Sequence, residues 1–467
     1  VSSINIWTYT AGTVSAGTST VRFATGGDAT YTINSGAMSF NNVTFNGANI
    51  PRFSITGTMD INGNLAIAGV YTLNNGTITV AGDITVTDTS FSGTTAITLD
   101  GTGAQVITLT ANDWTDGALT INKASGTATS SGTWTIPGAV TITSGALTLG
   151  AATSFSSSVT VGASGTLDAA TYLATITGTF SVTGTIKVGA LGASAFSSNY
   201  SKSPTLNAGS TVNYSGAGDQ TIDNTLSYKN LTISGSGIKT LGGATTVASN
   251  LTISSGTLAT STNQLSVTGA TSITGTLDIS GAGVSAHSFT GDITINTNGI
   301  WNNSGNADVT INGSITNNQT FTSGSGTYTL AGTSKTLAGT LTFAAISVSG
   351  TYTNTGTCTV TTTFAGAGTF TNAGTLNIGA ATVGPTLANA GAGYTWPQQT
   401  GSGSHYWASI ASSSDGTKLA ACVDGGYIYT STDSGATWTQ RTNSPAGSYY
   451  IASSTDGTKL ATAAYCC

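Results

Sequence analysis

Residues 140–188 read VTITSGALTLGAATSFSSSVTVGASGTLDAATYLATITGTFSVTGTIKV and contain a regular pattern. Gly145-Ala146-Leu147 recurs as Gly165-Thr166-Leu167 and again as Gly184-Thr185-Ile186, at a nearly constant spacing. Between these triplets, apolar residues alternate with Thr or Ser. A period of two is typical of a β-strand that buries one face. The stretch therefore predicts short strands that recur at regular intervals.

The same glycine-led triplet recurs through much of the chain before residue 383. Further examples start at Gly57 and Gly76, at Gly256 and Gly275, and at Gly339, Gly356 and Gly374. Three short strands in about 19 residues describe one rung, meaning one turn of a β-solenoid, whose inward side chains pack against neighbouring rungs. We therefore expect an all-β fold with a right-handed parallel β-solenoid of about 20 rungs. Tandem β-sandwich domains are the alternative.

A longer repeat is superimposed on the short one. The segment from Gly101 to Ile107 resembles the segment from Gly216 to Ile222, and it aligns Gln105 with Gln220. Lys335 follows Gln220 at the same spacing as Gln220 follows Gln105. Duplication of a block of about six rungs predicts this spacing, which favours one continuous solenoid.

The composition excludes several classes of function. Only 6% of the 467 residues are charged, all 17 acidic residues are Asp, and the net charge is −6. The 11 basic residues are scattered, whereas nucleic-acid binding needs clustered Lys and Arg. No apolar run approaches the roughly 18–20 residues that span a bilayer. We expect no nucleic acid, membrane span or cofactor, and a chain that is either a mature exported product or a fragment.

The four cysteines are Cys358, Cys422, Cys466 and Cys467. No Cys-x-x-Cys is present and the only histidines are His287 and His405, so we expect no metal site. A disulfide from Cys422 to Cys466 or to Cys467 is one alternative, and free thiols are the other. Because neither histidine lies near a cysteine and no Gly-x-Ser-x-Gly motif precedes a helix-forming segment, we expect no catalytic residues.

The composition changes after the predicted solenoid, which covers residues 1–383. Residues 384–404 are rich in Gly, Pro and Ser and are predicted to form a linker. Residues 405–467 are rich in aromatic residues and contain a repeat, because Ile410-Ala-Ser-Ser-Ser-Asp415 returns as Ile451-Ala-Ser-Ser-Thr-Asp456. The spacing between these two copies is typical of one propeller blade.

Residues 431–438 carry one recognisable motif. Ser431, Asp433, Gly435 and Trp438 match the pattern Ser-x-Asp-x-Gly-x-x-Trp, in which Asp can bind turn amides, Gly allows a positive φ and Trp packs back on the turn. This motif resembles the Asp box of BNR repeats in sialidase-like β-propellers. The resemblance implies a small propeller-like segment that is incomplete, with one blade and the start of a second. It implies a structural turn rather than catalysis, and Arg441 is the only Arg where a sialidase carries three.

The solenoid region resembles bacterial repetitive surface proteins of the filamentous-haemagglutinin or autotransporter-passenger kind. This resemblance implies secretion and a role at the bacterial cell surface. We therefore expect an extracellular structural or adhesive protein, not an enzyme, which binds copies of itself, as in a filament, or surface glycans. One alternative is a carbohydrate-binding or polysaccharide-cleaving protein, and a second is an ice-binding protein.

Several polar groups are candidate sites, although a structural role is favoured for each. Asn112–Gly117 could hold Ca²⁺ but is more typical of a turn. Asp219 and Asp223 could act as an acid pair but are predicted to lie on an exposed strand face. Pairs such as Thr141 with Thr143 and Thr108 with Thr110 would suit ice binding only if they formed a flat array. The glycosylation pattern Asn-x-Ser/Thr occurs at Asn42, Asn230, Asn250 and Asn318 and is expected by chance in this composition.

Overall fold

The chain forms two separate units whose regular secondary structure is almost entirely β-strand. The computed structural model describes residues 3–12, 14–48, 51–88, 91–110, 114–281, 286–379, 385–389 and 403–464. The first unit is Val1–Gly391 and the second, called the C-terminal unit below, is Ala392–Cys467. Strands account for 54% of the residues and helix for 1%. The prediction of an all-β fold is therefore confirmed.

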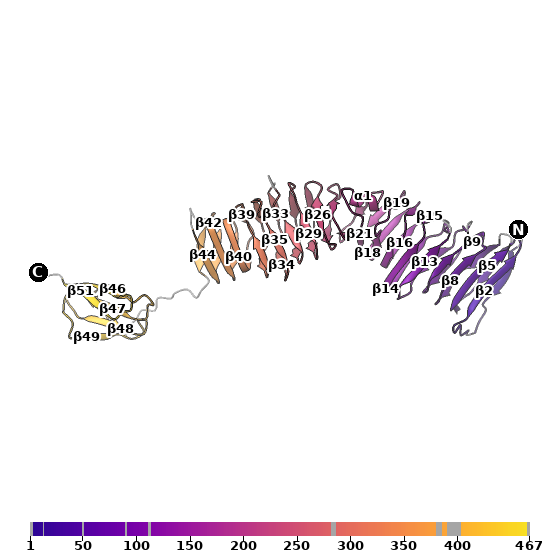
Figure 1. The fold of residues 1–467 in the computed structure, drawn as a ribbon. Coiled ribbons are helices and arrows are strands. Elements are labelled where there is room, and N and C mark those ends of the chain that lie inside the picture. Colours follow the sequence, from indigo (N-terminus) through magenta and orange to yellow (C-terminus); the bar gives the residue numbers. More distant parts are fainter. Residues whose placement is uncertain are drawn as a thin grey trace. The chain divides into compact units, whose positions relative to one another are not determined.

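The first unit is a parallel β-solenoid of about 17 rungs (Figure 1). Three short strands make a rung, and each pairs in parallel with the equivalent strand of the next rung. One such pair of rungs consists of β28 (Leu251–Ile253), β29 (Thr257–Ala259) and β30 (Leu265–Val267), followed by β31 (Thr271–Ile273), β32 (Thr276–Asp278) and β33 (His287–Phe289). Since the described strands of this unit pair only in parallel, the alternative of tandem β-sandwiches is wrong.

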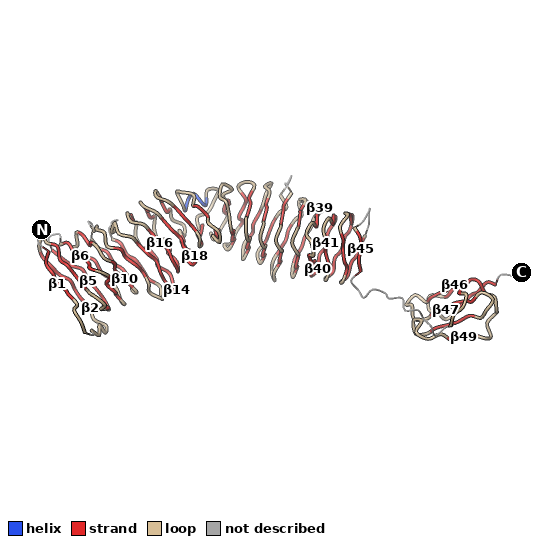
Figure 2. Tube along the Cα trace, turned by 180° about the vertical axis from the view of Figure 1, so that it is seen from behind, coloured by secondary structure: helices blue, strands red, loops and turns tan. Residues whose placement is uncertain are grey.

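Most strands of the stack, which Figure 2 shows from behind, belong to one sheet of 32 strands. A separate four-stranded sheet consists of β1 (Ser3–Thr8), β3 (Thr30–Asn34), β6 (Arg52–Thr56) and β9 (Thr72–Asn74). A second contains β24 (Gln220–Ile222), β26 (Ile238–Leu241), β29, β32, β35 (Ile300–Asn302) and β38 (Thr320–Thr322). The longer strands β14 (Leu119–Ser131), β16 (Val140–Thr148), β18 (Val159–Asp168), β40 (Lys335–Val348) and β42 (Thr357–Ala365) pass from one sheet to the next.

Burial follows the alternation of the sequence. In β10 (Thr77–Val80), Ile78 and Val80 are buried, whereas Thr77 and Thr79 face outward. The inward residues form one continuous apolar core from Phe23 to Phe370. Each buried Val, Leu, Ile or Phe stabilises the fold by about 1.5–3 kcal/mol relative to exposure. Stacking of inward apolar side chains at equivalent places in successive rungs therefore stabilises a chain with few charges.

The number of rungs is about 17 rather than the expected 20. The reason is that rung length varies more than the glycine triplets suggest. Leu231 pairs with Leu251 and Thr351 with Thr369, whereas Thr185 pairs with Thr211 and so closes a longer rung. This longer rung contains α1 (Ala195–Asn199), the blue segment at one edge of the stack in Figure 2.

The long repeat corresponds to a polar group inside the core. Gln105 and Gln220 are both buried, and each donates from Nε2 to two carbonyl oxygens of an earlier rung. The acceptors are Val80 and Gly82 for Gln105, at 3.0 and 2.5 Å, and Val188 and Ala190 for Gln220, at 2.9 and 2.6 Å. The repeat therefore marks places where a buried side chain bonds backbone oxygens of an earlier rung, and two of these oxygens, Val80 O and Val188 O, also accept amide hydrogens from Asp100 N and Ser215 N.

Lys335 does not continue this series. It is half-buried at the surface, where its Nζ lies 3.2 Å from Asp292 Oδ1. Tyr352 has the interior role instead, because its hydroxyl donates to Ile311 O at 2.7 Å and Gly313 O at 3.1 Å. Alignment at the spacing of the long repeat reaches Lys335 and misses Tyr352, which pairs with Lys335 one rung later.

The C-terminal unit is antiparallel. Its first sheet has the order β46 (Trp407–Ser412), β47 (Leu419–Val423), β48 (Ile428–Ser431) and β49 (Thr439–Arg441), and a separate hairpin joins β50 (Ser448–Ser453) to β51 (Leu460–Ala464). A small core of Ala420, Cys422, Ile428 and Ile451 lies between the two sheets. That the unit belongs to a β-propeller stays a prediction.

Candidate functional site

Two hairpin turns of the C-terminal unit repeat the same hydrogen bonds. In the first, Ser413 Oγ donates to Asp415 Oδ1 at 2.6 Å and accepts from Lys418 N at 3.0 Å. In the second, Ser454 Oγ donates to Asp456 Oδ1 at 2.6 Å and accepts from Lys459 N at 3.0 Å. Hydrogen bonds from Ser413 and Thr417 lower the pKa of Asp415 to about 2. The sequence repeat of this unit thus encodes a turn whose carboxylate accepts hydrogen bonds from the turn itself.

The turn at Ser431–Trp438 is built in a related way. Ser431 Oγ donates to Asp433 Oδ1 at 2.7 Å and accepts from Gly435 N at 2.8 Å, and Asp433 Oδ1 accepts from Thr437 N at 2.9 Å. Gly435 has a φ of +91°, and a Cβ there would meet Leu419 Cδ1 at 3.2 Å. Hydrogen bonds from Thr437, and to a smaller extent from Ser431, lower the pKa of Asp433 to about 2. These contacts give Ser431, Asp433 and Gly435 a role in shaping the turn.

Trp438 packs into an aromatic cluster that consists of His405, Trp407, Tyr429 and Trp438. The ring centroids of Trp407 and Trp438 are 6.2 Å apart, and those of His405 and Tyr429 are 5.1 Å apart. Tyr429 Oη lies 2.9 Å from His405 Nε2. Among the described residues, the hydrogen bond of the His405 ring thus goes to the buried Tyr429 rather than to a serine or an aspartate.

Next to this cluster lies a second group, the tyrosine surface, defined as Tyr406, Asp424, Tyr427 and Tyr449. Asp424 links two of these tyrosines, since its N donates to Tyr406 O at 2.8 Å and its Oδ2 accepts from Tyr449 Oη at 2.8 Å. That carboxylate raises the pKa of Tyr449 by accepting its proton in a hydrogen bond. Tyr406 is 87% exposed, and the three tyrosine rings are open to solvent.

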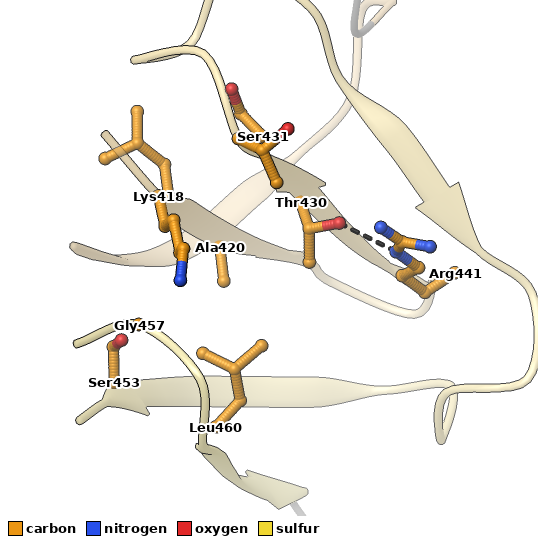
Figure 3. Close-up of a pocket in the computed structure, with 10 residues that line it drawn as sticks. Lys418, Ala420, Thr430, Ser431, Arg441, Ser453, Gly457 and Leu460 are labelled. Atoms are coloured by element: carbon orange, nitrogen blue, oxygen red, sulfur yellow. Dashed lines mark hydrogen bonds between the residues drawn. The ribbon is translucent and has the colours of Figure 1, made fainter. Parts of the chain in front are cut away.

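A pocket of about 160 Å³ separates the first sheet from the β50–β51 hairpin (Figure 3). Lys418 and Arg441 line it together with Thr430 and Leu460. Arg441 Nε donates to Thr430 Oγ1 at 2.7 Å, and Lys418 Nζ donates to Asp456 O at 3.0 Å. The pocket is small and carries two positive charges, but its described lining contains no carboxylate or nucleophilic base.

The acidic residues singled out in the solenoid are held in turns. Asp219 Oδ1 accepts from Ile238 N of the next rung at 2.8 Å, and Asp223 Oδ1 accepts from Thr225 N at 2.8 Å. Gln220 and Ile222 between them are buried. Asp223 borders a polar pocket of about 320 Å³ beside α1, but Asp219 does not line it. The structure therefore does not direct the two carboxylates into one pocket.

The asparagines of the glycosylation pattern link neighbouring rungs. Asn42 Oδ1 accepts from Asn64 N at 2.8 Å, Asn230 Oδ1 from Asn250 N at 3.1 Å, and Asn250 Oδ1 from Ala270 N at 2.9 Å. Asn230 also donates from Nδ2 to two carbonyls, so its amide is occupied at both ends.

The threonine pairs do not form two parallel rows. Thr141 lies in a single row with Thr98, Thr120 and Thr160, which pair across adjacent rungs. Thr143 falls at an irregularity of the ladder between β14 and β16 and takes no place in that row. Thr110, which follows Thr108 in the second pair, lies beyond the end of β13 (Gln105–Leu109). Ice binding by these residues stays a prediction.

Other predicted sites fall wholly or partly outside the described residues. These are Asn112 and Asp113 of the proposed Ca²⁺ loop, and Cys466 and Cys467 of the proposed disulfide. Of the Ca²⁺ loop, Thr115 is buried and donates to Gly93 O at 2.7 Å. Cys358 and Cys422, the two described cysteines, are buried free thiols.

Metal and membrane sites were also sought in the part of the chain that the structure describes. That part holds no group of three or more metal-binding His, Cys or Asp side chains. Its helical content includes no segment with the length and apolarity needed to cross a lipid bilayer.

Comparison of the chain with protein-family models, with curated proteins and with solved structures found no match. Sequence reasoning had pointed to the aromatic segment but missed the link between Asp424 and Tyr449, since the two lie far apart in the sequence and meet only in the folded unit. It also missed that Lys418, just before β47, and Arg441, in β49, line one pocket, because the β50–β51 hairpin completes that pocket with Ser453 and Leu460 only in the folded unit.

Proposed function

We propose that the protein is an extracellular structural or adhesive protein of a bacterial cell surface. The solenoid acts as a stable spacer, and the C-terminal unit contacts surface glycans. The observation that carries this proposal is the distribution of exposed rings. Tyr406, Trp407, Tyr427, Tyr449 and Tyr450 of the C-terminal unit are exposed. In the much longer described part of the solenoid, Tyr71 and Tyr172 are the exposed aromatic residues.

The chemistry of the tyrosine surface supports a sugar ligand. Flat aromatic faces pack against the apolar faces of sugar rings, while phenol hydroxyls supply hydrogen bonds at the edge. Asp424 adds an acceptor for sugar hydroxyls and already orients Tyr449. Clusters of exposed apolar rings rimmed by polar groups mark interaction surfaces.

The solenoid suits a spacer because its polar side chains serve its own backbone. Turn carboxylates and carboxamides such as Asp219 and Asn250 accept amide hydrogens from adjacent rungs. The apolar core continues through the stack. Such a stack can hold a contact unit away from a surface without binding ligands itself.

A glycan array probed with the full-length chain tests the proposal. We expect binding to a set of surface glycans, and the double variant Tyr406→Ala/Tyr449→Ala should weaken it by at least about tenfold, or ~1.4 kcal/mol. Tyr172→Ala is the matched control, because Tyr172 is exposed to nearly the same extent as Tyr449 but lies in the solenoid. Absence of binding to any glycan, or equal loss with the control, would contradict the proposal.

A further inference from the structure

The pocket between the first sheet and the β50–β51 hairpin of the C-terminal unit brings two positive charges together. Lys418 lies just before β47, Arg441 lies in β49, and both line the pocket. In the view of Figure 3 they lie on either side of Thr430. The three ion pairs among the described residues all lie in the solenoid. Neither Lys418 nor Arg441 therefore has a carboxylate partner in the part of the chain that the structure describes.

The aspartates of the neighbouring turns are engaged within those turns. Asp433 accepts a hydrogen bond from Ser431 Oγ at 2.7 Å, and Asp456 accepts one from Ser454 Oγ at 2.6 Å. The atom that Lys418 Nζ bonds, at 3.0 Å, is the backbone oxygen of Asp456 and not its carboxylate. Two like charges that face one small volume repel each other, and an anion between them replaces this repulsion with attraction.

The polar side chains around the pocket have hydrogens left to donate. Arg441 uses Nε for its bond to Thr430 Oγ1, at 2.7 Å, and its two terminal nitrogens have no hydrogen-bond partner among the described residues. Because Thr430 Oγ1 accepts that bond, its own hydrogen is left for a ligand. Lys418 has three hydrogens on Nζ and uses one of them for Asp456 O. Such a set of donors suits an oxyanion, which accepts hydrogen bonds and donates none.

The size and the apolar walls of the pocket favour one charged group of a larger ligand. The volume of about 160 Å³ is below the roughly 300–1,000 Å³ of pockets that enclose whole small molecules. Leu419, Ala420 and Leu460 supply apolar walls. Attraction between charges is stronger where such walls displace water.

The tyrosine surface lies toward the other end of one strand of the same unit. The strand β47 begins with Leu419, which lines the pocket, and ends with Val423, directly before Asp424 of the tyrosine surface. At about 3.4 Å per residue, the two ends of this strand are ~14 Å apart. A ligand that contacts both places must therefore be an extended chain.

We propose that this pocket binds the carboxylate or sulfate group of an acidic polysaccharide, while other sugars of the same chain pack on the tyrosine surface. The proposal rests on the glycan-binding function proposed above and names the class of glycan. Arg441 donates from its planar fork to two oxygens of the acidic group, Lys418 supplies the second positive charge, and the Thr430 hydroxyl donates a further hydrogen bond.

Binding of the full-length chain to immobilised polymers that differ in charge tests the proposal. Polygalacturonate is compared with its methyl ester, and dextran sulfate with dextran, so that each pair shares a sugar backbone. We expect at least one acidic polymer to bind at least about tenfold more tightly than its uncharged counterpart, because hydrogen bonds to charged groups are the stronger ones. Added salt should reduce this preference. The pair that shows the preference identifies the acidic group as a carboxylate or a sulfate.

The double variant Lys418→Gln/Arg441→Gln should lose this preference for the acidic polymer. Lys459→Gln is the matched control, because Lys459 has the place of Lys418 in the second copy of the sequence repeat but does not line the pocket. The control removes one positive charge from the same unit and should keep the preference.

The wild-type chain alone can overturn the proposal, whether or not a variant folds. Equal binding of the charged and uncharged members of both pairs, or binding of neither, would overturn it, and so would an equal loss of the preference in Lys459→Gln. The glycan-binding function would still stand if uncharged glycans bound and Tyr406→Ala/Tyr449→Ala weakened that binding. Absence of binding to every polymer and every glycan would overturn both.

Discussion

At the scale of single residues, polar side chains in this protein mostly serve the backbone. Asp219 and Asn250 accept amides one rung away, and Asp433 accepts an amide within its own turn. A charge-poor chain can fold this way because each buried or turn amide still finds an acceptor. Titratable residues that looked like candidate sites in the sequence are accordingly used for structure.

His287 is a residue whose burial has a measurable consequence. It is 1% exposed, Leu265 N donates to its Nδ1 at 3.1 Å, and its Nε2 has no hydrogen-bond partner among the described residues. Burial lowers the pKa of His287 from 6.5 to about 4. The folded state therefore holds the neutral imidazole, while the unfolded state takes up a proton below pH 6.5.

We predict that acid destabilises the solenoid through this residue. Between pH 6.5 and about 4 the free energy of unfolding should fall by roughly 3 kcal/mol, with little further loss from His287 below that range. Urea denaturation at a series of pH values measures the effect. His287→Leu should flatten the dependence over this range, whereas His405→Gln, in the other unit, should leave it unchanged. The same slope in His287→Leu would show that other groups cause it.

At the scale of elements, buried polar side chains connect strands by hydrogen bonds to the backbone of neighbouring rungs. Tyr352 is an example in β41 (Thr351–Asn354), since its hydroxyl binds the carbonyls of Ile311 and Gly313 and accepts from Gly332 N at 3.2 Å. Strong burial raises the pKa of Tyr352 to about 12, which keeps the hydroxyl protonated as a donor.

We predict that Tyr352→Phe costs about 1–3 kcal/mol, because it keeps the ring but removes a donor to Gly313 O and the acceptor of Gly332 N, while Ile311 O still accepts from Ala331 N. The loss should appear as faster amide hydrogen exchange in the neighbouring rungs, near Gly313 and Gly332. Tyr172→Phe, which removes a hydroxyl from an exposed ring, is the control and should change exchange little. Unchanged protection in Tyr352→Phe would mean that these hydrogen bonds add nothing to stability.

The sequence could predict features of these elements that depend on neighbouring residues, but not those that depend on contacts between residues far apart in the chain. Alternation around Ile78 and Val80 predicted the strands and their inward faces, because a period of two is local. The extra residues around α1 helped to make the expected number of rungs too high, because an insertion in a turn lengthens a rung but leaves the flanking alternation intact. The tyrosine surface could not be predicted beyond its composition, because Asp424 and Tyr449 meet only through the packing of separate sheets.

At the scale of the whole molecule, the solenoid is a stack of interchangeable rungs. Leu231 pairs with Leu251, and Leu251 pairs with Thr271, with the same register at each step. Contacts between neighbours dominate such a stack, so its stability is close to a sum over rungs.

Removal of one complete rung should therefore be tolerated. We predict that deletion of residues 251–270 leaves the far-UV circular dichroism per residue and the resistance to proteolysis unchanged, because Leu231 can then pair with Thr271. Deletion of residues 251–260 is the control, since it removes half a rung and places the following strands on the wrong sheets. Equal tolerance of both deletions, or unfolding by both, would argue against interchangeable rungs.

The central claim is that one continuous parallel stack, rather than a series of separate domains, makes up most of this chain. Electron cryo-microscopy of the full-length protein tests this claim most directly. The account predicts a solenoid segment about 80 Å long, from about 17 rungs at ~4.8 Å each, with that spacing visible along its axis. A row of separate globular domains without that spacing would contradict it.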